Sequence, residues 1–572
     1  MVAYLLTMNR TLAMFLLCFS LAAQIHQHVP PADQERVDLT KLPPPQHIDG
    51  IGVSHIAITT KSNEAQQWFD QGTALLHCFW DYEALRAFEQ AVRLDPDCAM
   101  CHWGVAQALE FRGKGHQDQV KEELAKAKEL GAKVSDHEQR YIRAATESHD
   151  KKGDEASQAF TKEMEALIDR YPDDVEARLF LALSSNGGYD AKGEPRSGSL
   201  YGQQALRNLL REFPENAAAN HYWIHAMEVS GHPEWAIESA EKLGQLAPAS
   251  GHMVHMPGHI FYRTGDYERA RQIFLDALKV DEDYMAKQHV AARDDWNYAH
   301  NISYLIADCA EAGRYQEARE HARTLAGLAN DPDHSGNVYF YVLQIGATED
   351  RLAIRFANRD EAIAHPMQFG VADDKLSSWI RCYRDGLGRY ARGMKNAESG
   401  RLAEADSDSN QLDALLWRLS REKSEKEEET NRRDRVLKIL GTASLELRGD
   451  IDTRKGDLDG GVTLLKRADE DEKEIGYSEP PQYSRPALEV LGVAYLRAGK
   501  FNEARATFTE VLARRPKSGF ALYGIAQAWD REGKKTEAAQ AYKEFLTAWQ
   551  HADPELPQMR AARDYLGLAQ SR

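Results

Sequence analysis

Two pairs of histidines are the residues of this chain best suited to chemistry. His221 and His225 form one His-x-x-x-His pair, and His255 and His259 form another. The two pairs match after a shift of 34 residues, because 221 to 255 and 225 to 259 span the same interval. Residues four apart share one helical face, so each pair would present two imidazoles from one helix. Neutral imidazole binds zinc, copper, iron and nickel, so the spacing predicts a transition-metal site.

A second motif with possible chemistry is Cys98-Ala99-Met100-Cys101-His102. Cys-x-x-Cys-His is the attachment sequence of c-type haem, so Cys98, Cys101 and His102 are candidate haem-binding residues. Trp103 and Gly104 continue an ordinary amphipathic helix, which places His102 at a packing position. A disulfide between Cys98 and Cys101, or two plain thiols, is therefore the favoured alternative.

Small and aromatic residues recur along the chain at fixed offsets, where two helices must approach closely. Counting from the first residue of each repeat, we expect glycine at position 8, alanine at 20 and 27, an aromatic at 24 and proline at 32. A repeat that starts at Ala65 meets all five positions, with Gly72, Ala84, Phe88, Ala91 and Pro96. Further repeats fit starts at Ala217, Gly251 and Arg485. This is the pattern of the tetratricopeptide repeat, so the chain is predicted to be an all-α tetratricopeptide-repeat solenoid.

The repeat register predicts which side chains line the concave surface, because the first helix of each repeat faces it. In the repeats from Ala217, Gly251 and Ala299 the groove-facing positions hold the candidate metal ligands His221, His225, Glu228, His252, His255, His259 and His300. Glu228 could be a ligand, a hydrogen-bonding anchor for an imidazole, or a base. The sequence leaves open whether His55 and His77 join this cluster. Between Ala270 and Ala318 the spacing is 48 instead of 34 residues, so an inserted loop is expected near residues 281–295.

The first residues of the chain suggest an exported protein. Residues 1–23 have the length and apolar run of a secretory signal peptide, which favours the periplasm or the extracellular space, and no later run could span a membrane. A Pro-rich lead-in is expected over residues 24–60, repeats with the histidine cluster over 61–330, a helical bridging segment over 331–440 and further repeats over 441–572. The formal net charge of −18 disfavours nucleic-acid binding, because no basic excess is available to release phosphate counterions.

The chain also resembles a family of bacterial exported tetratricopeptide-repeat proteins with His-Tyr-x-Ile-His-Ala and His-Met-Pro-x-His-Ile motifs. These motifs stand here at residues 221–226 and 255–260, and the likeness extends to Ser54-His55, His300-Asn301 and Tyr477-Ser-Glu-Pro-Pro481. The resemblance implies the fold and a histidine cluster but names no reaction.

Three hypotheses follow for the function. The first is an exported scaffold that binds a zinc, copper or iron ion through its histidines. The second makes the same site the metal centre of a hydrolase or an oxidase, with an open coordination position. The third is a metal-free interaction module that holds a protein or a peptide in its concave groove.

Overall fold

The computed structural model describes residues 36–190, 193–292, 295–329, 349–367, 373, 376–423, 427–476, 478–483 and 485–568. These residues form helices and no strand, apart from an isolated antiparallel bridge between Tyr189 and Pro195. The predicted signal peptide and the start of the lead-in lie outside them. The chain divides into two compact units, residues 1–257 and 258–572, and the boundary falls inside one helix.

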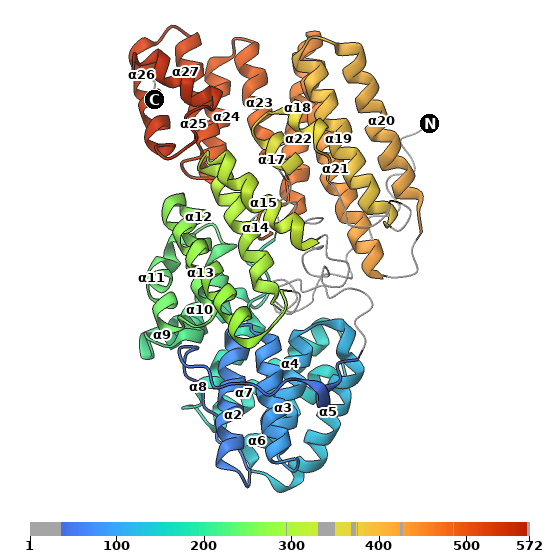
Figure 1. The fold of residues 1–572 in the computed structure, drawn as a ribbon, viewed down its shortest axis with the longest axis vertical. Helices are drawn as coiled ribbons and strands as arrows, with labels where there is room; N and C mark the ends of the chain where they lie inside the picture. The colour runs from blue at the N-terminus through green and yellow to red at the C-terminus, as the bar shows by residue number, and fades with distance from the viewer. Residues whose placement is uncertain are drawn as a thin grey trace. The chain divides into compact units, whose positions relative to one another are not determined.

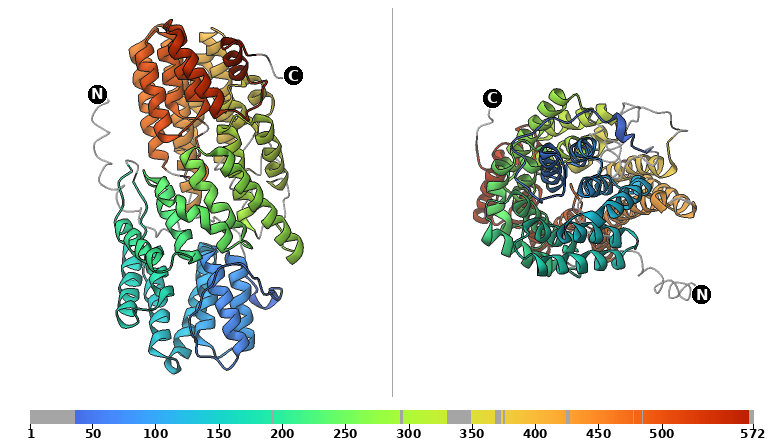
Figure 2. Two further views of the ribbon diagram at one scale, coloured as in Figure 1. Left: turned by 90° about the vertical axis from the view of Figure 1, so that its left-hand side faces the viewer. Right: turned by 90° about the horizontal axis from the view of Figure 1, so that it is seen from below.

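The first unit is a series of antiparallel helix pairs. Neighbouring helices such as α2 and α3, or α4 and α5, pack side by side, as Figures 1 and 2 show. Its helices are α2 (Asn63–His77), α3 (Asp81–Leu94), α4 (Ala99–Phe111), α5 (Gln117–Leu130), α6 (Asp136–His149), α7 (Asp154–Arg170), α8 (Val175–Ser185), α9 (Ser199–Glu212), α10 (Ala217–Glu228), α11 (Ile237–Leu246) and the first half of α12 (Gly251–Thr264).

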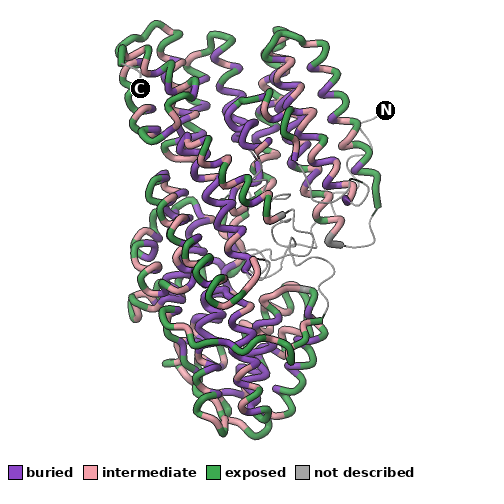
Figure 3. The backbone as a smooth tube through the Cα atoms, viewed as in Figure 1, coloured by how far each residue is buried: buried purple, intermediate pink, exposed green. Residues whose placement is uncertain are grey.

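The second unit continues with paired helices of less uniform length. They are α13 (Tyr267–Gln288), α14 (Trp296–Glu311), α15 (Tyr315–Ala329), α17 (Glu349–Arg355), α18 (Arg359–Ala364), α19 (Ser378–Glu398), α20 (Leu402–Arg421), α21 (Glu427–Lys455), α22 (Leu458–Ile475), α23 (Ala487–Arg497), α24 (Phe501–Arg514), α25 (Gly519–Arg531), α26 (Lys535–Ala548) and α27 (Pro557–Tyr565). Along most helices buried and exposed stretches alternate, which is the pattern of helices that bury one face (Figure 3).

Glycine and aromatic positions of the repeat pattern hold the helix pairs together. Gly72 of α2 and Gly104 of α4 both lie against the ring of Phe88 in α3. Gly492 of α23 and Gly524 of α25 lie against Phe508 in the same way. A side chain at any of these glycines would occupy the space of the ring, so the pattern sets the close approach of consecutive helices. The predicted all-α tetratricopeptide-repeat solenoid is confirmed.

Two segments depart from the 34-residue register for a visible reason. The inserted residues after Ala270 are mostly helical, because α13 runs for 22 residues to Gln288, so the expected loop is shorter than predicted. In the predicted bridging segment, α19, α20 and α21 have 21, 20 and 29 residues, which is too long for one repeat of 34 residues to hold a pair. Residues 330–348 of that segment lie outside the described residues.

The lead-in is an extended strap over the first unit. From Arg36 to Ser62 its only helical turn is Leu39–Lys41, and several of its backbone N–H groups bond to carboxylate and amide side chains of the first unit. Thr59 donates to Glu138 at 2.6 Å, and Lys61 donates to Asp95 at 2.8 Å. An irregular segment needs such partners because it has no ladder of its own.

A half-buried carboxyl group in the second unit makes stability depend on pH. Glu472 of α22 accepts the N–H of Ala487 at 2.7 Å, and burial raises its pKa from 4.5 to about 7. The folded state therefore holds this proton more tightly than the unfolded chain does, so the contribution to stability is present below pH 4.5 and is lost as pH rises through 7. Glu472→Gln should match the wild type at pH 5 and exceed it by about 2 kcal/mol at pH 8.5. Urea unfolding at both pH values measures this, and an equal difference at the two would contradict it.

Among the helices of the described residues, none has the length and apolar content needed to cross a membrane.

Candidate metal centre

Helix α10 carries the first histidine pair. The helix starts where the Asn216 side chain accepts the N–H of Ala219 at 2.8 Å, followed by three alanines that favour helix. His221 and His225 lie one turn apart on the same face. The Nε2 atoms of these two residues are 3.0 Å apart.

A third imidazole comes from the first turn of α12. His252 follows Ser250, whose hydroxyl accepts the N–H of Met253 at this helix start. Its Nε2 atom lies 3.1 Å from Nε2 of His221. His221, His225 and His252 can thus offer three ring nitrogens to one point.

Hydrogen bonds at the opposite ring nitrogens assign the tautomers of two of these histidines. Nδ1–H of His221 donates to the backbone carbonyl of His77 at 2.7 Å, and Nδ1–H of His225 donates to Glu228 at 2.6 Å. A neutral imidazole carries one N–H, so both Nε2 atoms bear lone pairs. Two lone pairs 3.0 Å apart repel each other unless a cation lies between them.

Burial keeps the imidazoles of His221 and His225 neutral. It lowers the pKa of His225 to about 3. Burial, together with the neighbouring His225, also lowers the pKa of His221 well below its usual range. Neutral imidazole is the form that binds a metal.

The nitrogen spacing suits a transition metal. Zinc–nitrogen bonds of about 2.0–2.1 Å in a tetrahedral arrangement put neighbouring nitrogens about 3.3 Å apart. The Nε2 atoms of His221 and His225 are 3.0 Å apart and those of His221 and His252 are 3.1 Å apart, so each pair would have to separate by a few tenths of an ångström around a zinc ion. Glu228, bound to His225, takes the role of an anchor that orients the ligand and raises its basicity.

An aromatic ring encloses the site. Phe79 packs on all three histidines, with ring centroids 4.6 Å from His221, 5.3 Å from His225 and 5.7 Å from His252. Its φ of +55° is in the left-handed region, which costs a non-glycine residue on the order of 1–3 kcal/mol. Backbone strain of this kind is common at functional sites, and here it puts an apolar ring against the three imidazoles.

A buried network that the sequence did not predict supports His221. The His77 side chain bonds to Glu176 at 2.5 Å through Nε2 and to the Tyr222 hydroxyl at 2.7 Å through Nδ1. Glu176 also accepts the backbone N–H of His55 at 3.3 Å. His77 therefore meets the cluster through its carbonyl oxygen, while the His55 ring pairs with Asp70 at the surface.

The remaining predicted ligands lie on α12 and α14. His255 is buried, and its ring centroid lies 6.2 Å from that of His252. In the second unit the rings of His259 and His300 have centroids 5.7 Å apart. The carboxylate of Glu479 lies 4.0 Å from Nδ1 of His259 and 3.9 Å from Nε2 of His300. Glu479 was not among the predicted ligands, although it lies in the Tyr-Ser-Glu-Pro-Pro motif.

The prediction that the seven candidate ligands line an open concave surface was wrong. All seven predicted ligands are at most 3% exposed, so they lie in the interior instead of on an open groove. His221, His225 and His252 pack against one another and against Phe79, which is the environment of an enclosed site.

The Cys-x-x-Cys-His motif has another role. Cys98 and Cys101 form a disulfide, and the sulfur of Cys98 accepts the N–H of Cys101 at the start of α4. His102 bonds to Glu123 at 2.6 Å and to the carbonyl of Pro96 at 3.1 Å. The disulfide uses both thiols that a haem attachment would need, and the His102 ring is held by protein.

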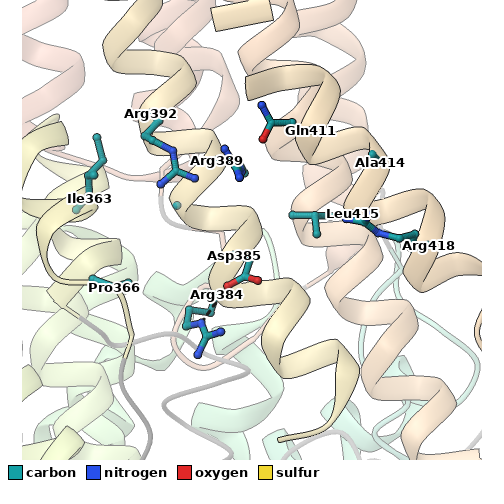
Figure 4. Close-up of a pocket in the computed structure, with 12 residues that line it drawn as sticks. Ile363, Pro366, Arg384, Asp385, Arg389, Arg392, Gln411, Ala414, Leu415 and Arg418 are labelled. Atoms are coloured by element: carbon teal, nitrogen blue, oxygen red, sulfur yellow. Dashed lines mark hydrogen bonds and ion pairs between the residues drawn. The ribbon is translucent and has the colours of Figure 1, made fainter. Parts of the chain in front are cut away.

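A surface cavity of about 580 Å³ in the second unit is separate from this chemistry. Figure 4 shows Arg384, Arg389, Arg392 and Arg418 around it, together with Asp385. None of the predicted metal ligands lines this cavity.

Comparison with known proteins agrees with the repeat pattern. Family models described as tetratricopeptide repeat match residues 83–133 and 490–554, and another of that description matches 253–284. The chain matches none of the curated proteins.

Solved structures match this chain at low similarity. A structure titled as the APC/C hetero-tetramer Cut9-Hcn1 is 13% identical, covers 87% of this chain and 76% of its own, and has a TM-score of 0.31. Yeast Tom70 is 13% identical, with coverages of 88% and 96% and a TM-score of 0.28. The human IFIT1 dimer with m7Gppp-AAAA is 13% identical, with coverages of 87% and 92% and a TM-score of 0.30. These likenesses carry no argument about function.

The repeat pattern, the paired helices and the matching family models together show that the chain is built with tetratricopeptide repeats.

Proposed function

We propose that this protein is an exported tetratricopeptide-repeat scaffold that binds a transition-metal ion through His221, His225 and His252. The observation that carries the proposal is the convergence of three buried Nε2 atoms, with two neighbouring separations of 3.0 and 3.1 Å. Lone pairs at this spacing, in a site from which burial excludes a compensating proton, suit a metal ion.

The donor set favours zinc or copper among the candidate metals. Three imidazoles with no thiolate fit zinc, copper or iron. Among divalent first-row metals, copper and zinc generally bind such donors with the highest affinities. Export is supported by the Cys98–Cys101 disulfide, because disulfides persist chiefly in oxidising compartments.

Metal loading of the purified full-length chain tests this proposal. His225→Ala removes one donor, and we expect its affinity for Zn²⁺ at the first unit to fall by more than about 100-fold, beyond the loss typical of an orienting residue. His232→Ala is the matched control, because that histidine is exposed and lies in the same unit. Mass-spectrometric metal analysis and calorimetric titration with Zn²⁺ and Cu²⁺ give the measurement.

Two results would refute the proposal. One is a folded wild type that binds none of zinc, copper, iron or nickel. The other is a His225→Ala protein with unchanged affinity and stoichiometry. Circular dichroism of both variants separates loss of a ligand from loss of the fold.

A catalytic metal centre is the second candidate, favoured by the number of protein donors. Three imidazoles are the protein ligand set of some catalytic zinc sites, where water takes the fourth position. The metal-loaded protein would then hydrolyse an activated ester or oxidise a phenol with dioxygen, and His225→Ala would not. A protein that binds the metal but neither hydrolyses the ester nor oxidises the phenol would support the metal-binding scaffold instead.

A further inference from the structure

The second unit contains another convergence of metal-binding groups. His259 comes from α12, His300 from α14, and Glu479 from the connection between α22 and α23. We propose that these three side chains form a second metal site with two imidazoles and one carboxylate. Its three proposed ligands differ from those of the site in the first unit.

The geometry brings two ring nitrogens toward one carboxylate oxygen. Oε2 of Glu479 lies 4.0 Å from Nδ1 of His259 and 3.9 Å from Nε2 of His300. Adjacent donors on a metal ion stand roughly 3.0–3.4 Å apart when bonds are about 2.1 Å. Each nitrogen–oxygen separation therefore needs to shorten by roughly half to one ångström around an ion, which rotation of the Glu479 side chain can supply.

Packing restricts the rings to this arrangement. The His259 ring lies 4.1 Å from that of Tyr304 by centroid and also contacts Phe274. His300 packs against Trp296, with centroids 5.6 Å apart. The imidazole side chains are 0% and 3% exposed and the carboxylate is 10% exposed. A carboxylate in such surroundings is stabilised by a metal cation.

The donor chemistry differs from that of the first unit. Two histidines with one carboxylate form the ligand set of non-haem Fe(II) oxygenases and of several zinc hydrolases. A carboxylate oxygen also suits Mn(II), which three neutral imidazoles suit less well. We therefore expect the second site to take Fe(II), Mn(II) or Zn(II), and Mn(II) serves as the selective probe.

Anaerobic titration of the full chain with Mn(II), followed by electron paramagnetic resonance of the free ion, tests the site. The wild type should bind one Mn(II), and Glu479→Gln should weaken this binding by at least about tenfold. Glu474→Gln is the matched control, because Glu474 is exposed in the same unit. His225→Ala should keep Mn(II) binding, which separates this proposal from the proposed function of the first unit.

Further variants keep the test decisive if Glu479→Gln unfolds. Glu479→Asp retains the charge but shortens the side chain, and His300→Ala removes a donor; both should also lose at least about tenfold in affinity. A folded His225→Ala protein that binds no Mn(II), Fe(II) or Zn(II) would overturn the proposal. So would a folded Glu479→Gln protein with wild-type Mn(II) affinity.

Discussion

Replacing Glu311 by alanine should destabilise the second unit by about 3–5 kcal/mol, because it leaves the buried guanidinium group of Arg355 and the half-buried one of Arg515 without their shared carboxylate. Glu311 ends α14, and its carboxylate accepts Arg355 at 3.1 Å and Arg515 at 2.6 Å. Burial would raise the pKa of Glu311, yet the two arginines lower it below its usual range. The carboxylate is therefore charged in the folded protein and joins elements that are far apart in the sequence.

The matched control for this prediction is a carboxylate paired at the surface. Glu268 pairs with Arg314 and has a side chain that is 48% exposed, so Glu268→Ala should cost less than about 1 kcal/mol. Urea unfolding followed by circular dichroism gives both values. Equal losses in the two variants would show that the buried pairs of Glu311 contribute no more than a surface pair.

Much of the fold could be predicted because repeat contacts are local. Gly258 and Phe274 lie 16 positions apart in one repeat, and a Cβ atom on Gly258 would be 2.3 Å from the ring. Such a contact needs one small and one large residue at a fixed spacing in the sequence. The contact can therefore be predicted wherever glycine and an aromatic residue recur at that spacing. The length of α13 and of α19 to α21 was not predictable in this way, since their extra turns follow helical periodicity without the repeat offsets.

The closeness of His221 and His252 could be predicted from the repeat register, but the surroundings of these histidines could not. A shared register places His221 near His252, because the two occupy neighbouring helices of consecutive repeats. The enclosure was missed because it depends on Phe79, whose left-handed backbone has no signature in the sequence. Glu176 and Glu479 were missed for another reason: Glu176 reaches His77 across 99 residues, and Glu479 lies in an irregular connection.

Gly104→Ala should destabilise the first unit by about 1–3 kcal/mol, although the same change usually stabilises a helix by up to about 1 kcal/mol. A Cβ atom at residue 104 would lie 2.2 Å from Cδ1 of Phe88. That ring is fully buried and is confined from the other side by Gly72. The ring must rotate or the helices must separate, so the steric cost outweighs the gain in helix propensity.

A matched glycine and a double variant show whether the clash is the cause. Gly244 of α11 has its nearest neighbour 4.0 Å from a built Cβ, so Gly244→Ala should be neutral or stabilising in urea unfolding. Phe88→Leu shortens the opposing side chain, and in that background Gly104→Ala should cost less than in the wild type, with a coupling of about 1 kcal/mol. Additive losses of stability in the double variant would mean that the effect of Gly104 comes from its backbone and not from a clash with Phe88. The rule that small residues set the approach of consecutive helices would then not hold at this pair.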